Sequence, residues 1–531
     1  MNALAAGSAR ARRPGAPAGR QAGGTGRGGR TQRSVATWLT GAVSTVVVAL
    51  AGFVATPLLV RWLGDTQWGA WTIVGEWLGY LGLTHLALGP GAMTIFLLRA
   101  HTGEEAGALT AMAKRGLRLY TWTALALIPL ALGLAWWAPL ALQADAALTT
   151  SLRWAVGIAA AGSLVLAPSQ LVRSVLETVQ RGYLVRAALL LQSLLITGLS
   201  LWWVWLRWGI VGMAAASFTG MAVGAGLWAW FARRWLPGWR QAAPAQLSGR
   251  ELWRLNWPLI VAMAGNQLNV LTDNTVVGVM IGPAAVAGFA LTQSLPLLAG
   301  ARLTDVGSVS WAALGELKAR SVEAFRERVV ELAATVLGVG MVIMATVAAF
   351  NRPFVELWVG AAHYDGALLT WATAAGMALF GLLCFFSWLI DTQGDTRRRL
   401  WASSIGSGLN LGLSLWLVQR WGVAGVAAAT AAAYACTDAW YLPYVAVRQY
   451  GVPGRALARA LGGAAVRGGL WTVVVAAAVS RLPEAHTWVQ LAAEAAGAGA
   501  VGAAYCWSVI LRAGDRAAWR ARWTAWVARP A

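Results

Sequence analysis

Long apolar runs separated by short polar segments recur along the whole chain. Each run has at least 18 residues, enough for a helix to cross a hydrocarbon core of about 30 Å. Lipid offers backbone groups no hydrogen-bond partners, and a barrel would show alternation instead of long runs, so the pattern predicts helices. Fourteen spans are predicted, at residues 38–60, 67–90, 119–142, 153–172, 186–206, 209–231, 257–281, 284–303, 329–350, 366–390, 400–418, 421–443, 463–480 and 488–511.

Two stretches in the first half of the chain have near copies in the second half. GLSLWWVWLRWGIVGMAAAS (Gly198–Ser217) returns as GLSLWLVQRWGVAGVAAAT (Gly412–Thr430), an offset of 214. LGDTQWGAW (Leu63–Trp71) returns as IGPAAVAGF (Ile281–Phe289), an offset of 218. Six helices separate the copies, an even number, which predicts two parallel six-helix repeats about a pseudo-twofold axis along the membrane normal. A substrate path is then expected where the halves meet.

Spans 13 and 14 have no counterpart in the repeat and form an appended helix pair. The chain is therefore expected to be an all-α polytopic membrane protein with six parts. These are a disordered basic cytoplasmic tail (1–36), an N-terminal six-helix half (37–232), a cytoplasmic linker (233–256), a C-terminal six-helix half (257–445), the appended helices (446–511) and a second basic cytoplasmic tail (512–531).

Composition and charge placement agree with a membrane protein. Apolar residues make up 58% of the chain and charged residues 12%, about half the charge density of soluble domains. The net charge is +21, and with the N-terminus in the cytoplasm 36 of the 42 Lys and Arg fall in cytoplasmic segments. This bias follows the positive-inside rule and predicts two cytoplasmic termini. We expect the Arg/Gly-rich tail to contact anionic lipid headgroups. RNA binding is a less favoured alternative for this tail, so the prediction is that the protein has no nucleic-acid partner.

The candidate chemistry points away from an enzyme. Cys384, Cys436 and Cys506 lie in apolar segments without a CxxC pair, which indicates neither a metal site nor a disulfide framework. There is no P-loop, and the single GxGxxG, at 497–502, lies inside a span, where small residues favour helix packing. The longest external loop, about Asn351 to Asp365, is too short and sparse for a catalytic constellation. We expect no enzymatic activity and no cofactor.

Polar residues inside the spans are the best candidates for a transport site, since each is costly unless it faces protein or water. Span 2 carries Glu76, with Tyr80 one turn away. We expect Glu76 to be a proton- or sodium-responsive cavity residue, or to pair with an Arg of another helix. Span 7 is the most polar. Helical periodicity places Asn266, Asn269 and Asp273 on one face and Gln267 and Asn274 on the adjoining stripe, and this face is expected to line the cavity between the halves or to make interhelical hydrogen bonds.

Three further stretches carry a resemblance to a known family. They are RWLGDTQWGAWTIVGEWLGYL (Arg61–Leu81), DNTVVGVMIGPAAVAGFAL (Asp273–Leu291) and FNRPFVELWVGAAHYDG (Phe350–Gly366). From about Trp38 to Tyr450 the chain resembles the polysaccharide (O-antigen-type, Wzx-type) flippases of the multidrug/oligosaccharidyl-lipid/polysaccharide exporter superfamily. It departs from the family where an Asp-Leu-Gly-Leu stretch late in helix 2 is replaced by His85-Leu86-Ala87-Leu88.

This resemblance implies a MATE-like transporter fold and a substrate class. The implied function is movement of a polyprenyl-diphosphate-linked oligosaccharide across a bacterial cytoplasmic membrane by alternating access, with polysaccharide polymerase or export machinery as possible partners. Basic residues at the cytoplasmic mouth, Arg99, Arg173 and Arg254, are candidates for attracting the diphosphate, although the positive-inside rule places arginines there in any case. The alternatives are a drug/cation antiporter of the same superfamily, a peptidoglycan-precursor lipid flippase and, less favoured, a membrane glycosyltransferase or ligase.

Overall fold

A computed structural model of the chain describes residues 27–511, with gaps at 89–91, 104–106, 246–249, 251–256, 258–271 and 392–395, and isolated positions of 514–524. In the described part the regular elements are all helical. The first group is α1 (Arg27–Leu63), α2 (Asp65–Leu88), α3 (Ala92–Thr102), α4 (Ala108–Ala126), α5 (Ile128–Ala141), α6 (Ala146–Thr178), α7 (Gly182–Trp205), α8 (Gly209–Ala232) and the 3₁₀ turn η1 (Arg233–Trp235).

The second group follows the gap at 258–271. It consists of α10 (Asp273–Met280), α11 (Pro283–Arg320), α12 (Val322–Val359), the 3₁₀ turn η2 (Ala361–His363), α13 (Ala367–Asp391), α14 (Thr396–Trp421), α15 (Val423–Cys436) and α16 (Asp438–Tyr450). The chain then continues through α17 (Gly454–Val479), α18 (Trp488–Tyr505) and the short π-helix η3 (Cys506–Ile510).

The helices match the membrane spans expected from the apolar runs. Nine helices among the described residues are long and apolar enough to cross a membrane, and every predicted span overlaps at least one helix. The predicted span 119–142 is divided into α4 and α5 at Leu127, because Pro129 has no N–H to continue the helical hydrogen bonds. The chain is a multi-pass membrane protein.

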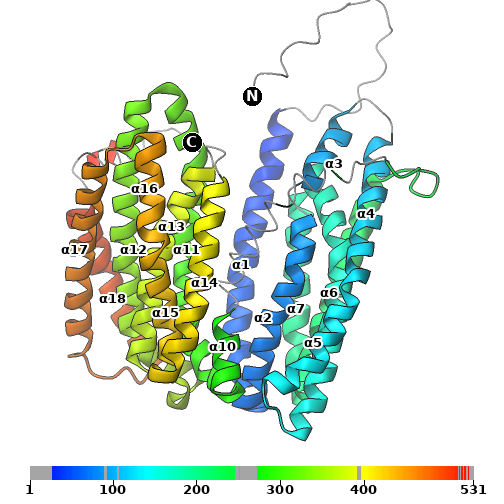
Figure 1. Cartoon of the computed structure of the whole chain (residues 1–531), viewed down its shortest axis with the longest axis horizontal. Coiled ribbons are helices and arrows are strands. Elements are labelled where there is room, and N and C mark those ends of the chain that lie inside the picture. Colours follow the sequence, from blue (N-terminus) through cyan, green and yellow to red (C-terminus); the bar gives the residue numbers. More distant parts are fainter. Residues whose placement is uncertain are drawn as a thin grey trace, which may run out of the picture.

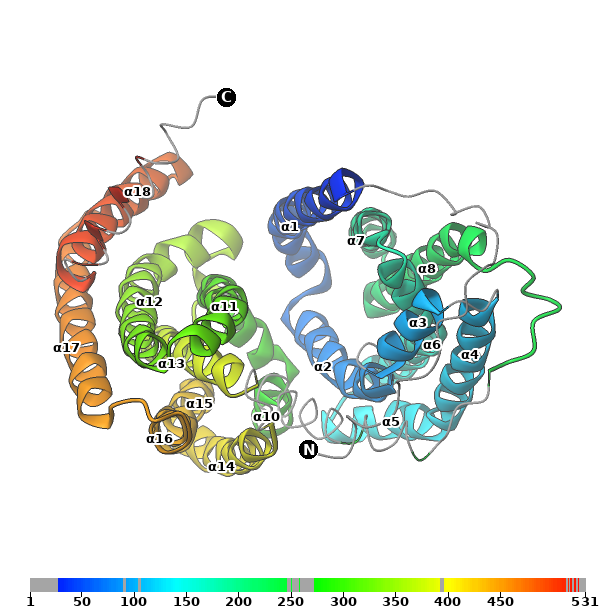
Figure 2. The ribbon, with the colours of Figure 1, turned by 90° about the horizontal axis from the view of Figure 1, so that it is seen from above.

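The helices form two bundles that lie side by side. Seen from above, α1–α8 form one bundle and α10–α16 the other, while α17 and α18 lie outside the second bundle against α12 (Figure 2). From the side, most of the long helices run roughly parallel, and α10 lies at the end of the bundles opposite the start of α1 (Figure 1). The bundles meet chiefly where α2 contacts α10 and α11.

Paired glycines with positive φ occupy corresponding turns in the two bundles. Gly64 lies in the turn between α1 and α2, and Gly282 in the turn between α10 and α11; their φ angles are 74° and 129°. Gly209 is the first residue of α8, and Gly422 lies between α14 and α15; their φ angles are 55° and 58°. Positive φ is unfavourable for residues with a Cβ, which explains why the repeated stretches share these glycines. The expected all-helical fold with parallel repeats is confirmed.

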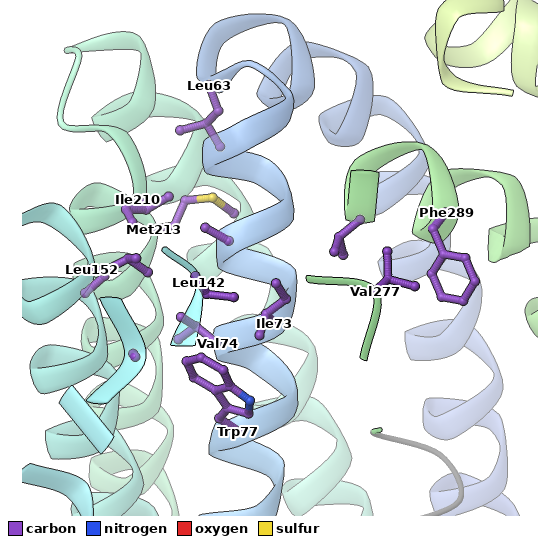
Figure 3. Packing of buried hydrophobic residues seen from close by; sticks show 14 of the residues in the cluster. Leu63, Ile73, Val74, Trp77, Leu142, Leu152, Ile210, Met213, Val277 and Phe289 are labelled. Atoms are coloured by element: carbon purple, nitrogen blue, oxygen red, sulfur yellow. The ribbon is translucent and has the colours of Figure 1, made fainter. Parts of the chain in front are cut away.

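One cluster of buried apolar side chains spans both bundles. Ile73 of α2, Val277 of α10 and Phe289 of α11 are fully buried in it (Figure 3). The backbones approach closely nearby, because a Cβ on Gly69 of α2 would lie 1.8 Å from the carbonyl oxygen of Pro283. Since lipid is as apolar as these side chains, van der Waals packing and close backbone approach hold such helices together.

Two element boundaries differ from the expectation. Helix α1 begins at Arg27, inside the tail expected to be disordered through residue 36, because no proline follows Pro17 there and extending an existing helix is favourable. Helix α12 continues to Val359, so its connection to α13 is Gly360–Gly366 and is shorter than expected. An i,i+4 pair between Arg352 and Glu356, 2.8 Å apart, supports that last turn. The division of the chain into six parts otherwise stays a prediction.

Candidate functional site

Glu76 joins the two halves of the molecule. Its side chain on α2 is only 5% exposed and accepts four hydrogen bonds from the first residues of α10. Its Oε1 accepts from the Asn274 backbone N–H (3.4 Å) and from Asn274 Nδ2 (2.7 Å). Its Oε2 accepts from the Thr275 backbone N–H (2.9 Å) and from Thr275 Oγ1 (2.8 Å). One carboxylate of the first half therefore binds the start of a helix in the second half.

The position of Glu76 follows from the needs of a helix end. The first N–H groups of a helix have no partner within that helix, and they carry the positive end of its dipole. Thr272, the residue before α10, makes no side-chain cap hydrogen bond. Glu76 supplies both the acceptors and the negative charge from across the interface. Among the described arginines none forms an ion pair with Glu76, whose partners are Asn274 and Thr275.

Asp273, the first residue of α10, belongs to a second polar cluster within the C-terminal half. Thr430 of α15 donates a hydrogen bond from Oγ1 to Asp273 Oδ2 (3.0 Å), and the same Oγ1 lies 3.1 Å from Asn410 Oδ1 of α14. Ser414 Oγ lies 3.3 Å from Asn410 Oδ1. The cluster joins α10, α14 and α15 through oxygen-rich side chains.

Two oxygens at this interface have no hydrogen-bond partner. Asp273 Oδ1 and Asn274 Oδ1 are both buried from solvent and accept no hydrogen bond from the residues that the structure describes. Unsatisfied buried acceptors are costly, and oxygen ligands are the kind that protons and hard cations take. In the described part of the chain no group of three or more His, Cys, Asp or Glu side chains gathers as a metal cluster. The arrangement is suited to charge compensation within a membrane.

The structure places only part of the expected polar face of span 7. Asp273 and Asn274 lie at the interface, whereas Asn266, Gln267 and Asn269 lie outside the described residues. Helix α10 starts at Asp273 after a bend at Thr272, so the span is not the unbroken helix from which the common face was inferred. The free N–H groups at the start of α10, those of Asn274 and Thr275, are the ones that Glu76 binds.

Other expected residues are less engaged with this interface. Tyr80 lies in α2, and its side chain is outside the described set. Arg99, at the exposed end of α3, lies over the Phe96 ring at 5.9 Å. Arg173 on α6 already pairs with Glu177 at 2.9 Å, which occupies part of its guanidinium. Arg254 falls in the gap at 251–256.

Sequence reasoning missed Thr275, Asn410, Ser414 and Thr430. A signal existed for two of them, since Asn410 and Ser414 are polar residues four apart in an apolar span and therefore share a helix face. Thr430 ends the repeated stretch that begins at Gly412, but hydroxyl side chains usually bond to their own helix and give little signal.

A second link between the halves lies at the end of α2 nearest α1. His363 Nε2 of η2 lies 2.9 Å from Asp65 Oδ1, while the His363 carbonyl accepts a bond from Thr292 Oγ1 of α11 at 3.0 Å. The Asp365 backbone N–H donates to the same Thr292 oxygen at 2.9 Å. Burial raises the pKa of the Asp365 carboxyl to about 6; His363 lowers it and the Asp65 carboxylate raises it by smaller amounts.

The fold can be compared with solved structures. The structure of the lipid II flippase MurJ in an inward closed conformation aligns with a TM-score of 0.67 at 13% identity, over 89% of this chain and 98% of that one. An inward-facing multidrug resistance MATE family transporter of the MOP superfamily aligns with a TM-score of 0.59 at 14% identity, over 80% and 96%. A MOP superfamily transporter from Pyrococcus furiosus gives 0.51 at 16% identity, over 85% and 97%. At such identities the likeness establishes a MATE-like fold.

The sequence comparison gives the family. None of the curated proteins matches the chain. The sequence model described as "polysaccharide biosynthesis protein" matches residues 34–301, which is 268 of 531 residues and spans the N-terminal half together with α10 and the first half of α11. The chain therefore combines a duplicated, MATE-like helical fold with polar contacts between its halves, and it belongs to the polysaccharide biosynthesis protein family.

Proposed function

We propose that this protein moves a polyprenyl-diphosphate-linked oligosaccharide, the repeat unit of a polysaccharide, from the cytoplasmic to the outer leaflet by alternating access. The observation that carries the proposal is the bond between Glu76 and the start of α10, in a chain of the polysaccharide biosynthesis family. The sugars and the diphosphate need a polar path between the halves, while the lipid tail stays in the bilayer. A contact that crosses this interface must break for the cargo to leave.

The contacts between the halves support this mechanism by their location. Gly69 against Pro283, Asp65 against His363, and the Trp358 indole N–H donating to the Phe53 carbonyl (2.8 Å) all lie toward the end where α1 stops. Bundles held together at one end can separate there when they close at the other, which is how a site between them becomes accessible to the two sides in turn. No step requires a covalent intermediate, and we propose a non-enzymatic transporter.

We further propose that the protein lies in the cytoplasmic membrane of a bacterium with both termini in the cytoplasm. The charge bias supports this orientation, and it makes the end where α1 stops the outer end. Reporter fusions placed after Arg33 and after Arg516 should both give a cytoplasmic signal. An external signal at either position would contradict the orientation. Polysaccharide polymerase or export proteins would be the natural partners, since they consume the translocated unit.

The experiment that tests the substrate uses the full chain in liposomes. A polyprenyl-diphosphate-linked oligosaccharide with a radiolabelled terminal sugar is placed in both leaflets, and a glycosidase added outside releases the label from the outer leaflet. Because the added glycosidase reaches only the outer leaflet, protein-free vesicles should release about half of the label, and vesicles with the protein nearly all of it. Release that stays at half with folded protein would refute the proposal.

A second candidate function is a peptidoglycan-precursor flippase. The alignment with the lipid II flippase MurJ over 89% of this chain favours it, because it extends beyond the twelve helices of the repeats. The same liposomes with lipid II separate the two candidates: faster translocation of lipid II than of the oligosaccharide lipid would favour the precursor. Uptake of a cationic dye, with neither lipid moved, would identify a drug/cation antiporter instead.

A further inference from the structure

A basic, aromatic pocket lies at the end of the N-terminal half where α1 begins. It is formed by the turn between α6 and α7 together with the end of α8 and η1, and its volume is about 260 Å³. Its lining includes two arginines, Arg181 and Arg234, and a set of aromatic rings: Tyr183, Trp230, Phe231 and Trp235. None of these residues takes part in the contacts of Glu76 or Asp273.

The backbone fixes Arg181 at the pocket. The Arg181 N–H donates to the Leu176 carbonyl (2.8 Å) and the Gln180 N–H donates to the Glu177 carbonyl (3.0 Å). This pair of bonds ends α6 in a Schellman motif, which requires a left-handed residue before Arg181. Gln180 takes that conformation with φ of 60°, although glycine would be the usual residue. The turn therefore holds Arg181 in one place.

The Arg181 side chain is held in the pocket wall and is only partly exposed. Its guanidinium lies over the Trp235 ring at 5.2 Å and over the Tyr183 ring at 5.9 Å. Its Nη1 donates a hydrogen bond to the Tyr183 hydroxyl at 2.7 Å, and its Nε is buried without a hydrogen-bond partner. Arginines at a membrane interface normally extend their charge into water. This one is stacked between rings and keeps unused donors.

The positive charge of the pocket favours an anionic ligand. Among the described residues no Asp or Glu lines it, so the charges of Arg181 and Arg234 are not neutralised from within the wall. Guanidinium groups bind phosphate oxygens through parallel N–H donors, and the Tyr183 hydroxyl, which accepts from Arg181, still has its own hydrogen to donate. An anion with several oxygens fits these donors better than a carboxylate or a neutral sugar.

The rest of the wall is apolar. Trp230 and Phe231 at the end of α8 have ring centroids 4.9 Å apart, and Trp230 is half exposed on the outside of the bundle. The cavity is slightly smaller than the roughly 300–1,000 Å³ typical of pockets for whole ligands. It is large enough for a headgroup, and the exposed Trp230 ring at its wall is available to an attached carbon chain.

We propose that this pocket binds a phosphate group, with Arg181, Arg234 and Tyr183 holding its oxygens and the tryptophans contacting the carbon skeleton esterified to it. The site lies within one half of the protein, away from the interface between the halves, and goes beyond the proposed translocation. The phosphate belongs to an anionic lipid headgroup or to a free phosphate compound at the same membrane surface.

The test measures binding of a fluorescent short-chain phosphatidylglycerol to the full chain in a neutral detergent, with phosphatidylcholine and inorganic phosphate as competitors. The double variant Arg181→Gln, Arg234→Gln should bind at least about tenfold more weakly, because each lost charge-assisted bond is worth roughly a factor of ten. The matched control is Arg233→Gln, the neighbouring arginine, which lies over Trp230 at 5.3 Å but does not line the pocket. It should stay within about threefold of wild type, since it contributes only general surface charge.

The competitors distinguish the two sources of phosphate. Displacement by millimolar inorganic phosphate supports a free phosphate compound, and resistance to it supports a lipid headgroup. Equal weakening by Arg233→Gln and by the double variant would overturn the proposal, because general surface charge would then explain the binding. Unchanged binding by the double variant would overturn it as well.

Milder variants keep the test valid if the double variant does not fold. Tyr183→Phe keeps the ring and removes one donor, so binding should weaken a few-fold with an unchanged melting temperature. Arg181→Lys keeps the charge but loses the planar pair of donors, and it should also weaken binding. If both variants bind like wild type, the pocket does not hold the phosphate.

Discussion

Replacing Glu76 with Gln should release the two halves from each other at the outer end. The Glu76 carboxylate accepts bonds from Asn274 on one oxygen and from Thr275 on the other, all four between 2.7 and 3.4 Å. The amide of Gln keeps the size and shape of the side chain but has one acceptor oxygen in place of two. Its NH₂ group then faces donors of α10, and at least one buried N–H loses its acceptor.

The magnitude follows from the bonds that are lost. A hydrogen bond to a charged group contributes about 1.5–3 kcal/mol net. An amide costs less to bury than a carboxylate, which offsets part of the loss, so we expect a change near the lower end, about 1.5 kcal/mol. This bond forms only while the halves are in contact, so the variant should shift the equilibrium toward the separated arrangement roughly tenfold.

The assay is a distance measurement between spin labels at Ala147 and Gln419 in lipid nanodiscs. Both residues are exposed, at the start of α6 and the end of α14, and the adjoining turns lie at the end of the bundles where α10 lies (Figure 1). The three native cysteines must be replaced first. Wild type should show mainly the short distance, and Glu76→Gln should add a longer one.

A second carboxylate, Glu177, provides the control for this experiment. Glu177→Gln makes the same chemical change in a carboxylate that pairs with Arg173 within α6, so it should leave the distances unchanged. If Glu76→Gln gives the wild-type distribution, or a larger share of the short distance, the carboxylate does not hold the halves together. The reasoning about alternating access would then lose its main support.

Three other variants test the surrounding structure. Asp273→Asn should leave the melting temperature nearly unchanged but slow translocation at least about tenfold if the charge serves transport, because it removes charge from a carboxylate with an unpaired buried oxygen; normal translocation would make the cluster a packing feature. Gly69→Ala puts a Cβ 1.8 Å from the Pro283 carbonyl oxygen and should lower stability by about 1–3 kcal/mol in a thermal melt, whereas Gly75→Ala, with open space on the same helix, should not. The raised pKa of Asp365, about 6 against an ordinary 3.8, means that the folded protein holds this proton more tightly than the unfolded chain. The stabilising effect of this proton is complete below about pH 4 and is lost as the pH rises through about 6. Over that range the wild type should therefore lose stability relative to Asp365→Asn. A difference in melting temperature between the two proteins that stays constant with pH would contradict this.

The membrane-spanning fold could be predicted because it depends on local sequence. A run of 18 or more apolar residues must form a helix in lipid wherever it lies in the chain, and the fourteen runs overlap the helices of the structure. The parallel repeat was visible because the turns at Gly209 and Gly422 both need a positive φ, which favours glycine in both halves. The two halves share the same residue at positions where few residue types can adopt the required backbone conformation.

The candidate site was only partly predictable, since its contacts join distant parts of the chain. The sequence alone identified Glu76, Asp273 and Asn274 as costly polar residues inside spans. The common polar face of span 7 was inferred by treating the span as one unbroken helix. In the described segment helix α10 starts only at Asp273, after a bend at Thr272, so that inference does not hold there. Thr430 and Asn410 reach Asp273 from two other helices, and their side chains look ordinary in the sequence.

The sequence by itself determined which segments lie in the membrane, how the halves repeat and which side chains are expensive to bury there, because these properties follow from composition and local backbone geometry. Only the tertiary structure decided what satisfies those side chains. Glu76 meets the start of α10 from 198 residues away, and a free helix end attracts a carboxylate only when folding brings the two together. Hydrogen-bond partners across an interface depend on the relative placement of whole helices, which no local pattern encodes.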